Sequence, residues 1–226
     1  MKPHPTHIIL AATLCLSSPL AAADIKWEIG EEVYVDGQGG ALPAVPSIPP
    51  GHPLVFGRGG NYAGNQKYFP VSESEGLAFS GFGTAVVPGL WTNIAGFSIM
   101  LDVTFGRLDV EQSLVMVPGV FDLRLSVVDG IPSLDFIGVR EPARPLYLKT
   151  TDVGEGSRLR IVASMNASGE MKLRVNETEV AAGSLGQPPS APVMYPDLYV
   201  GSANPEVYRR PFTGVLHSLS VTTEKK

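Results

Sequence analysis

The 226-residue sequence contains a single cysteine, Cys15. It lies in an apolar run near the N-terminus, so the chain beyond it has no thiol with which to form a disulfide. Exported domains without disulfides depend on a hydrophobic core, and a chain of this length can bury a sufficient one. The scarcity of cysteine therefore predicts a domain that is held together by packing alone.

Long apolar runs are also lacking. The longest, residues 8–16, is far shorter than the ~20 residues that a membrane-spanning helix needs. It follows Lys2, precedes three alanines at 21–23, and no acidic residue occurs before Asp24. This order is typical of a secretory signal peptide cleaved after Ala23, with an N-terminal membrane anchor as the alternative. We therefore expect a secreted, periplasmic or cell-surface protein with no membrane span after cleavage.

Charge is sparse as well. Charged residues make up 17% of the chain, and the formal net charge is −5. Loss of Lys2 with the leader makes the mature chain slightly more acidic. Because no cluster of lysine and arginine forms a basic patch, the sequence gives no reason to expect nucleic acid or anionic lipid as a partner.

Helical periodicity, heptads and internal repeats are absent. Short segments instead alternate apolar and polar residues, and Gly, Pro, Asn and Asp separate them. In residues 97–105 every second residue is apolar, starting with Phe97. Further strands are predicted at 84–87, 113–117, 121–127, 133–139, 158–164, 170–175, 198–201 and 212–221. Many short strands at this spacing predict an all-β fold, in which two antiparallel sheets pack as a sandwich.

The N-terminal part of the mature chain differs in composition. A short strand is predicted at 25–29, but residues 37–53 are dominated by glycine and proline and cannot join a central strand ladder. About fifty residues with so few apolar positions cannot build a separate core. The expected organisation is a leader (1–23), an extension packed on the sandwich (24–76), the sandwich itself (77–222) and a tail (223–226).

Five short motifs occur in a characteristic order along the chain. They are Leu77-Ala78-Phe79-Ser80-Gly81, the strand 97–105, the hairpin 121–137 with Asp129-Gly130, the turn and strand 165–176, and Leu198-Tyr199-Val200-Gly201 followed by Pro211-Phe212-Thr213-Gly214. Together they resemble the bacterial laminin G-like domains of the concanavalin A-like lectin and glucanase superfamily. The resemblance implies a two-sheet jelly roll. It also implies functions as different as glycan binding, protein adhesion and glycan cleavage, so the fold does not decide the function.

Catalytic motifs are missing. The glucanases of the superfamily carry E-x-D-x-x-E on one strand, whose carboxyl groups act as nucleophile and general acid. The nearest string here, Asp109-Val110-Glu111, is better explained as a solvated loop. The mature chain has no G-x-S-x-G and only two histidines, His52 and His217, which are too few for a zinc site. The sequence therefore favours a non-catalytic role.

Calcium is the one cofactor that the resemblance raises. Calcium-binding laminin G-like domains use an acidic residue at the rim together with carbonyl oxygens. Val120 occupies the position of that acidic residue in this chain. The remaining candidate ligands are Asp102, Asp152 and Asn204.

Glycan recognition requires an aromatic ring for the C–H face of a sugar, with polar groups around its hydroxyls. The predicted binding residues are Trp91, Asn93, Asn204, Tyr208, Arg209 and Arg210. Trp91 can instead fill the edge of the sandwich, and the segment around Tyr208 can be a solvated loop. Convergence of these residues on one rim is what would make them a site.

The leading hypothesis is an exported, non-catalytic module that binds carbohydrate or another cell-surface ligand. The alternatives are a structural or adhesion protein that binds another protein, and a divergent polysaccharide hydrolase or lyase. Two sequons, at Asn166 and Asn176, would be glycosylation sites only in a eukaryotic secretory pathway.

Overall fold

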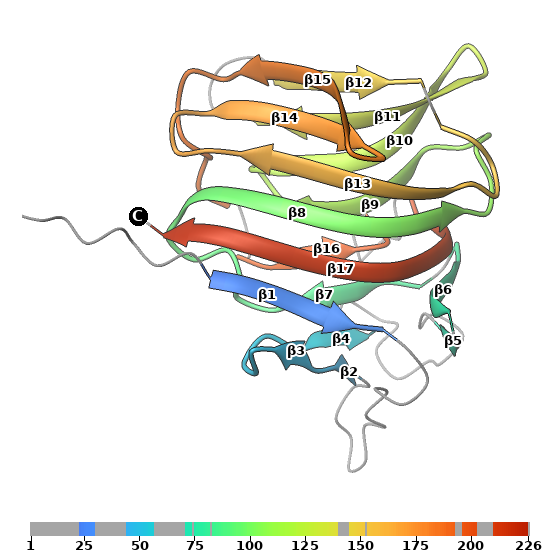
Figure 1. The fold of residues 1–226 in the computed structure, drawn as a ribbon, viewed down its shortest axis with the longest axis horizontal. Helices are drawn as coiled ribbons and strands as arrows, with labels where there is room; N and C mark the ends of the chain where they lie inside the picture. The colour runs from blue at the N-terminus through green and yellow to red at the C-terminus, as the bar shows by residue number, and fades with distance from the viewer. Residues whose placement is uncertain are drawn as a thin grey trace, which may run out of the picture.

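The computed structural model describes residues 23–29, 44–56, 71–73, 75–81, 83–139, 145–151, 153–192, 196–202 and 210–225. In these ranges no helix is long and apolar enough to cross a membrane. The described chain is built from strands (Figure 1). They are β1 (Ala23–Glu28), β2 (Ala44–Val45), β3 (Ser47–Ile48), β4 (Leu54–Phe56), β5 (Val71–Glu73), β6 (Gly76–Ser80), β7 (Ala85–Val87), β8 (Ile94–Phe105), β9 (Gln112–Val117), β10 (Phe121–Val128), β11 (Ile131–Gly138), β12 (Leu146–Thr150), β13 (Arg158–Met165), β14 (Glu170–Val175), β15 (Thr178–Ser184), β16 (Leu198–Val200) and β17 (Thr213–Lys225).

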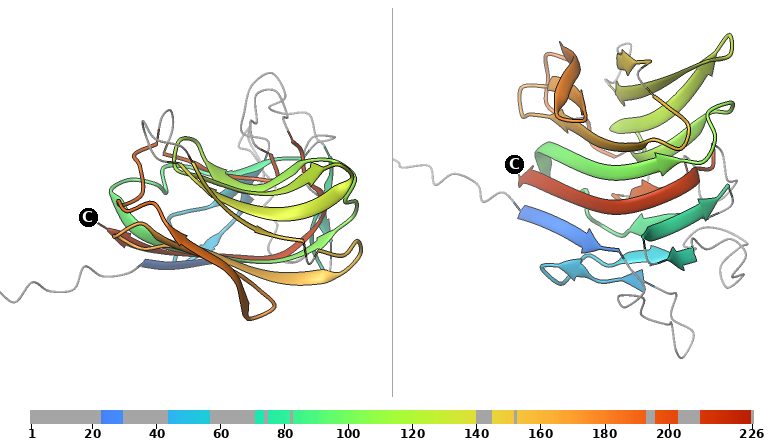
Figure 2. Two further views of the ribbon diagram at one scale, coloured as in Figure 1. Left: turned by 90° about the horizontal axis from the view of Figure 1, so that it is seen from above. Right: turned by 45° about the vertical axis from the view of Figure 1, so that its right-hand side comes forward.

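The strands form two antiparallel sheets that pack face to face, as Figure 2 shows from above. Sheet A has the order β15-β14-β13-β8-β17-β1-β3, with β6 also pairing with β17 and β5 pairing with β6. Sheet B has the order β12-β11-β10-β9-β16-β7-β4-β2. Neighbours in this order are often distant in sequence, as in a jelly roll. The predicted all-β, two-sheet jelly-roll sandwich is therefore confirmed.

The core lies between the sheets and follows from the alternation in the sequence. In β8 the apolar residues from Phe97 to Phe105 are buried, and the residues between them are only partly buried. Phe97 of sheet A stacks on Phe121 of sheet B with ring centroids 4.8 Å apart. The ring of Phe136 packs edge-on against that of Phe97, with centroids 6.3 Å apart. Burying each such ring contributes ~1.5–3 kcal/mol, so these contacts hold the two sheets together.

Residues from the N-terminal extension supply strands to both sheets. β1 pairs with β17 from Ala23↔Thr223 to Glu28↔Ser218, while β2 and β4 lie at one edge of sheet B. In its described part, residues 44–53, the Pro- and Gly-rich segment forms the two-residue strands β2 and β3 at the ends of the strand orders, because proline cannot donate to a ladder. Of the predicted leader (1–23), residues 1–22 lie outside the described residues, and its last residue, Ala23, begins β1.

The outer faces of the two sheets differ. On sheet A the outward side chains of β13 and β14 are mostly exposed or partly exposed. On sheet B several outward polar side chains of β9, β10 and β11 are deeply buried, including Ser113, Asp122 and Asp135. Buried polar groups need partners, so the outer face of sheet B carries an ordered polar network.

Candidate functional site

The network on sheet B is assembled by strand register. Residues 121, 123 and 125 of β10 point into the core, so Asp122 and Arg124 point outward. Arg124 pairs in register with Asp135 of β11, which pairs with Lys149 of β12. The neighbouring row joins Asp122 through Ile137 to Tyr147 of β12. We call Asp122, Arg124, Asp135, Tyr147, Lys149 and the adjoining Arg210 the sheet B polar face.

Asp122 is the centre of this face. Its carboxylate accepts a hydrogen bond of 2.6 Å from the Ser113 hydroxyl and lies 3.0 Å from an Nη atom of Arg210. An Nη atom of Arg124 lies 3.8 Å away on the other side. Burial raises the pKa of the Asp122 carboxyl, and the Arg210 charge and the Ser113 hydrogen bond oppose that rise. The positive charges of the two arginines therefore offset part of the desolvation of the Asp122 carboxylate.

Arg210 reaches the face from the segment just before β17. Its carbonyl accepts a 2.8 Å hydrogen bond from the Ser113 amide, so its backbone lies beside β9. The Phe212 amide donates to the Gly201 carbonyl, and the Gly201 amide donates to Leu114, both at 2.8 Å. These bonds fix the two described ends of the 203–209 segment against sheet B. Arg210 is thus a sequence-predicted residue that the structure places at the candidate site, where its ion pair with buried Asp122 also gives it a structural role.

Asp135 and Lys149 form the second ion pair of the face. The Asp135 side chain is fully buried; it accepts 2.7 Å from the Ser133 hydroxyl and lies 3.2 Å from Lys149 Nζ. The Lys149 ammonium also lies 5.5 Å from the ring centroid of Tyr147. A half-exposed lysine thus covers the carboxylate and lies beside the ring.

Tyr147 provides what a sugar-binding surface needs. Among the residues the structure describes it is the one exposed aromatic side chain, with 45% of its surface accessible. Sequence reasoning missed it because the five-residue strand β12 was not predicted. The alternation of Leu146 and Leu148 with Tyr147 and Lys149 is the pattern that could have predicted this strand.

Trp91 and Asn93, two of the other predicted binding residues, lie elsewhere. Trp91 is only 2% exposed and packs edge-on against Phe97 at 4.9 Å, which matches the alternative that it fills the sandwich edge. It lines a hollow of about 290 Å³ with Asn93. The Trp91 amide donates to Pro196, which precedes β16, whereas Arg210 lies past the end of that strand. The two positions are on the order of 15 Å apart along the strand and do not converge. Asn204, Tyr208 and Arg209 fall outside the described residues.

The calcium candidates do not form a described site. Both carboxylate oxygens of Asp102 accept hydrogen bonds from Arg158, at 2.8 and 2.7 Å. These bonds lower the pKa of Asp102 and occupy the groups a metal would need. No group of three or more His, Cys, Asp or Glu residues in the described ranges could hold a metal ion. Asp152 and Asn204 lie outside those ranges.

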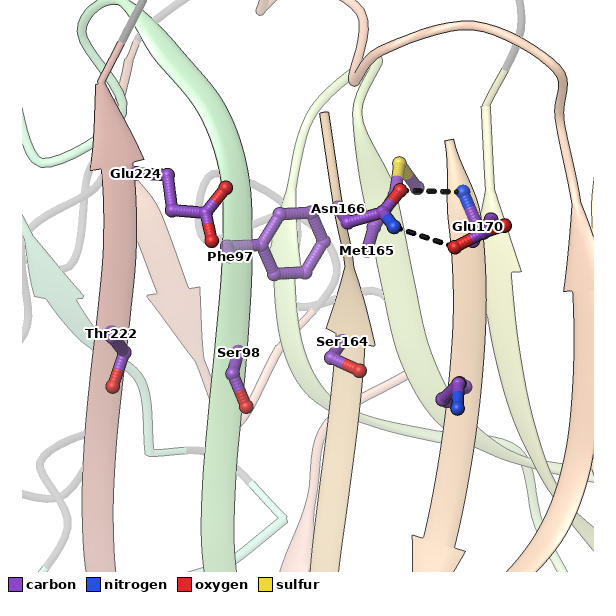
Figure 3. Close-up of a pocket in the computed structure, with 9 residues that line it drawn as sticks. Phe97, Ser98, Ser164, Met165, Asn166, Glu170, Thr222 and Glu224 are labelled. Carbon is purple, nitrogen blue, oxygen red and sulfur yellow. Dashed lines mark hydrogen bonds between the residues drawn. The ribbon is translucent and has the colours of Figure 1, made fainter. Parts of the chain in front are cut away.

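A second polar hollow, of about 220 Å³, lies on the outer face of sheet A (Figure 3). Its lining residues are Phe97, Ser98, Ser164, Met165, Asn166, Glu170, Lys172, Thr222 and Glu224. Asn166 and Glu170 are bonded to each other by side chain and backbone, and the hydroxyls of Ser98 and Ser164 lie in one cross-strand row. The only ring in the lining belongs to Phe97, which is 4% exposed. This hollow therefore offers polar groups without a platform for a sugar.

Comparison with known proteins supports the fold and leaves the family open. No protein-family model matches the sequence, and no curated protein matches it. Domain 4 of AbnA, an extracellular GH43 arabinanase from Geobacillus stearothermophilus in complex with arabinotriose, is 17% identical with a TM-score of 0.53. The match covers 67% of this chain and 72% of that domain.

Two further solved structures share the fold. The CBM40 domain of the Ruminococcus gnavus IT-sialidase, bound to α2,3 sialyllactose, is 13% identical with a TM-score of 0.50, covering 68% of this chain and 88% of that one. The enzymatically active domain of bacteriophage CBA120 tailspike protein 2 is 11% identical with a TM-score of 0.50, covering 67% and 25%. The matched structures thus include two glycan-bound modules and a quarter of an enzymatically active tailspike chain, and a shared fold does not decide the function.

Proposed function

We propose that the chain is an exported, non-catalytic module that binds carbohydrate through the sheet B polar face. The observation that carries the proposal is the exposed ring of Tyr147 two strands away from the Asp122–Arg210 ion pair. Adjacent strands lie ~4.8 Å apart, so the ring and the ion pair are ~10 Å apart, which a short oligosaccharide spans. The ring can stack on a sugar, and the fixed charged groups can bind its hydroxyls.

The comparisons support glycans as the ligand class. The arabinanase domain and the CBM40 domain share this fold at a TM-score of 0.50 or above, and both were solved with an oligosaccharide bound. Support from the chain itself is independent of them. A surface with one exposed ring and several fixed polar groups suits a ligand that has both a C–H face and hydroxyls.

The geometry favours binding over glycoside cleavage. Asp122 and Asp135 occupy diagonal positions on β10 and β11, which places their backbones ~7–8 Å apart. A glycosidase needs both carboxyl groups in contact with one glycosidic bond. Asp135 is fully buried beneath Lys149, so it has no access to a substrate.

A glycan array followed by calorimetric titration tests the proposal. We expect the purified protein to bind a glycan, and Tyr147→Ala to weaken that binding at least tenfold, equivalent to ~1.4 kcal/mol. Ile48→Ala is the matched control, because Ile48 is 46% exposed at the opposite edge of the sandwich. It should bind as wild type does. Absence of any bound glycan, or unchanged affinity in Tyr147→Ala, would overturn the proposal.

A further inference from the structure

The sheet B polar face has a local charge opposite to that of the whole chain. It combines three cations, Arg124, Arg210 and Lys149, with two carboxylates, Asp122 and Asp135. The chain as a whole has a formal net charge of −5. Both carboxylates are buried, whereas about half of the Lys149 side chain and smaller parts of both arginines are accessible. An approaching ligand therefore meets an excess of positive charge.

In the described part of the chain, the hydrogen bond shown by the Arg124 side chain uses only its Nε. Its Nε donates to the Ser126 hydroxyl at 3.0 Å, and one Nη lies 3.8 Å from Asp122, which is beyond hydrogen-bond distance. The terminal N–H groups of a partly buried guanidinium are best satisfied by a planar anion that accepts from two of them at once.

Lys149 adds a second cation for an anionic ligand, close to the ring of Tyr147. It lies on β12 beside Tyr147, and Asp135 separates it in register from Arg124. Because Asp135 is buried between these cations, it holds them apart without presenting negative charge at the surface. A ligand stacked on Tyr147 thus has cations along one side.

Two places on sheet A give a useful contrast. On sheet A the Arg158 guanidinium is engaged by both oxygens of Asp102. The hollow of Figure 3 contains Glu170 and Glu224 with a single cation, Lys172, so its local charge is negative. A carboxylate ligand would be repelled there and attracted to sheet B.

We infer that the ligand of the sheet B polar face is an acidic glycan, one whose uronate or sialate carboxylate is bound by Arg124 while a sugar ring stacks on Tyr147. This inference rests on the proposed function and narrows its ligand class. The shared chemistry of the two acidic sugars is a carboxylate attached to a pyranose ring.

The test compares acidic and neutral glycans on the full chain. The probes are sialyllactose against lactose, and trigalacturonate against galactotriose, each measured by calorimetric titration at low salt. At least one acidic glycan should bind tenfold or more tightly than its neutral counterpart. Because exposed charges are screened by salt, raising ionic strength should reduce this preference.

Substitutions of Arg124 test whether this residue causes the preference for acidic over neutral glycans. Arg124→Gln should weaken binding of the acidic glycan more than binding of its neutral counterpart, and so remove most of the acidic preference. Arg124→Lys should retain only part of that preference because an ammonium lacks the planar fork. If Arg124→Gln fails to fold, Arg124→Lys alone decides, since unchanged preference in it contradicts bidentate binding. Arg160→Gln on sheet A is the control and should behave as wild type.

The outcomes separate the two proposals. Equal, Tyr147-dependent binding of acidic and neutral glycans overturns the acidic ligand and leaves carbohydrate binding intact. Acidic preference that persists in both Arg124 variants also overturns it. Failure to bind any glycan overturns both.

Discussion

At the scale of single residues, the pKa values of two carboxyl groups shift in opposite directions because their surroundings differ. Asp102 is held by two hydrogen bonds from Arg158, which lower its pKa. Asp122 is buried on the outer face of sheet B, and burial raises its pKa despite the nearby arginines. Both are aspartates on strands with similar alternation, so the difference comes from their neighbours across the sheet.

These shifts predict opposite pH dependence. With a lowered folded pKa, Asp102 contributes stability above its unfolded pKa of ~3.9 and loses it as pH falls through the folded value. The deficit of Asp102→Asn should therefore be ~0.5 kcal/mol at pH 6 and smaller at pH 3, the modest size reflecting a solvent-exposed partner. Asp122 has a raised folded pKa, so ionisation costs stability as pH rises above ~3.9. The stability of Asp122→Asn relative to wild type should rise with pH.

Urea denaturation of wild type and both variants between pH 3 and pH 6 checks this prediction. The slopes of the two differences against pH should have opposite signs. Parallel slopes would mean that the surroundings of the two carboxyl groups do not differ as the structure indicates.

At the scale of elements, register places the functional side chains and glycines fix the connections. Gly201 has a φ of +80°. Its amide donates to Leu114 of β9, and its carbonyl accepts from Phe212, just before β17. A Cβ at this position would strike the ring of Phe79. Gly201 therefore couples the core to the segment that carries Arg210.

Gly201→Ala should destabilise the fold by ~2–4 kcal/mol, because strained backbone and a steric clash with the core act together. Gly186→Ala is the matched control: its φ is +69°, but a Cβ there meets nothing within 4 Å. It should cost only the ~1 kcal/mol of backbone strain. Chemical denaturation measures both, and equal losses would contradict the role given to the Phe79 contact.

At the scale of the whole molecule, one core joins both sheets and the N-terminal strands. β1 pairs with β17, while β8, the other long strand of sheet A, packs its aromatic residues against sheet B. Trp27 of β1 is 1% exposed and its indole donates to the His52 carbonyl at 2.8 Å. The described part of the N-terminal extension thus packs against the sandwich.

We therefore expect the mature chain to unfold as one cooperative unit without a disulfide or a metal. Scanning calorimetry should show a single transition, and its midpoint should not change on addition of EDTA. Two separated transitions would indicate that residues 24–76 fold apart from the sandwich, and a lower midpoint with EDTA would indicate a bound metal.

The sequence by itself determined the fold class. The alternation of apolar residues in β8, β10, β13 and β14 is a local property of the chain, and it specifies strands with one buried face. Strand β12 was not predicted, although the alternation of Leu146 and Leu148 with Tyr147 and Lys149 is present in the sequence. The candidate site was therefore not predicted either, since Tyr147 lies on that strand.

Only the tertiary structure decided which polar residues meet. Arg210 lies 88 residues from Asp122 in sequence, yet their side chains are 3.0 Å apart. Trp91 looked equally suitable for binding but is covered by Phe97 and Phe121. Local pattern fixes the direction of a side chain relative to its own strand, whereas strand order and register decide what lies opposite it, and these depend on the whole chain.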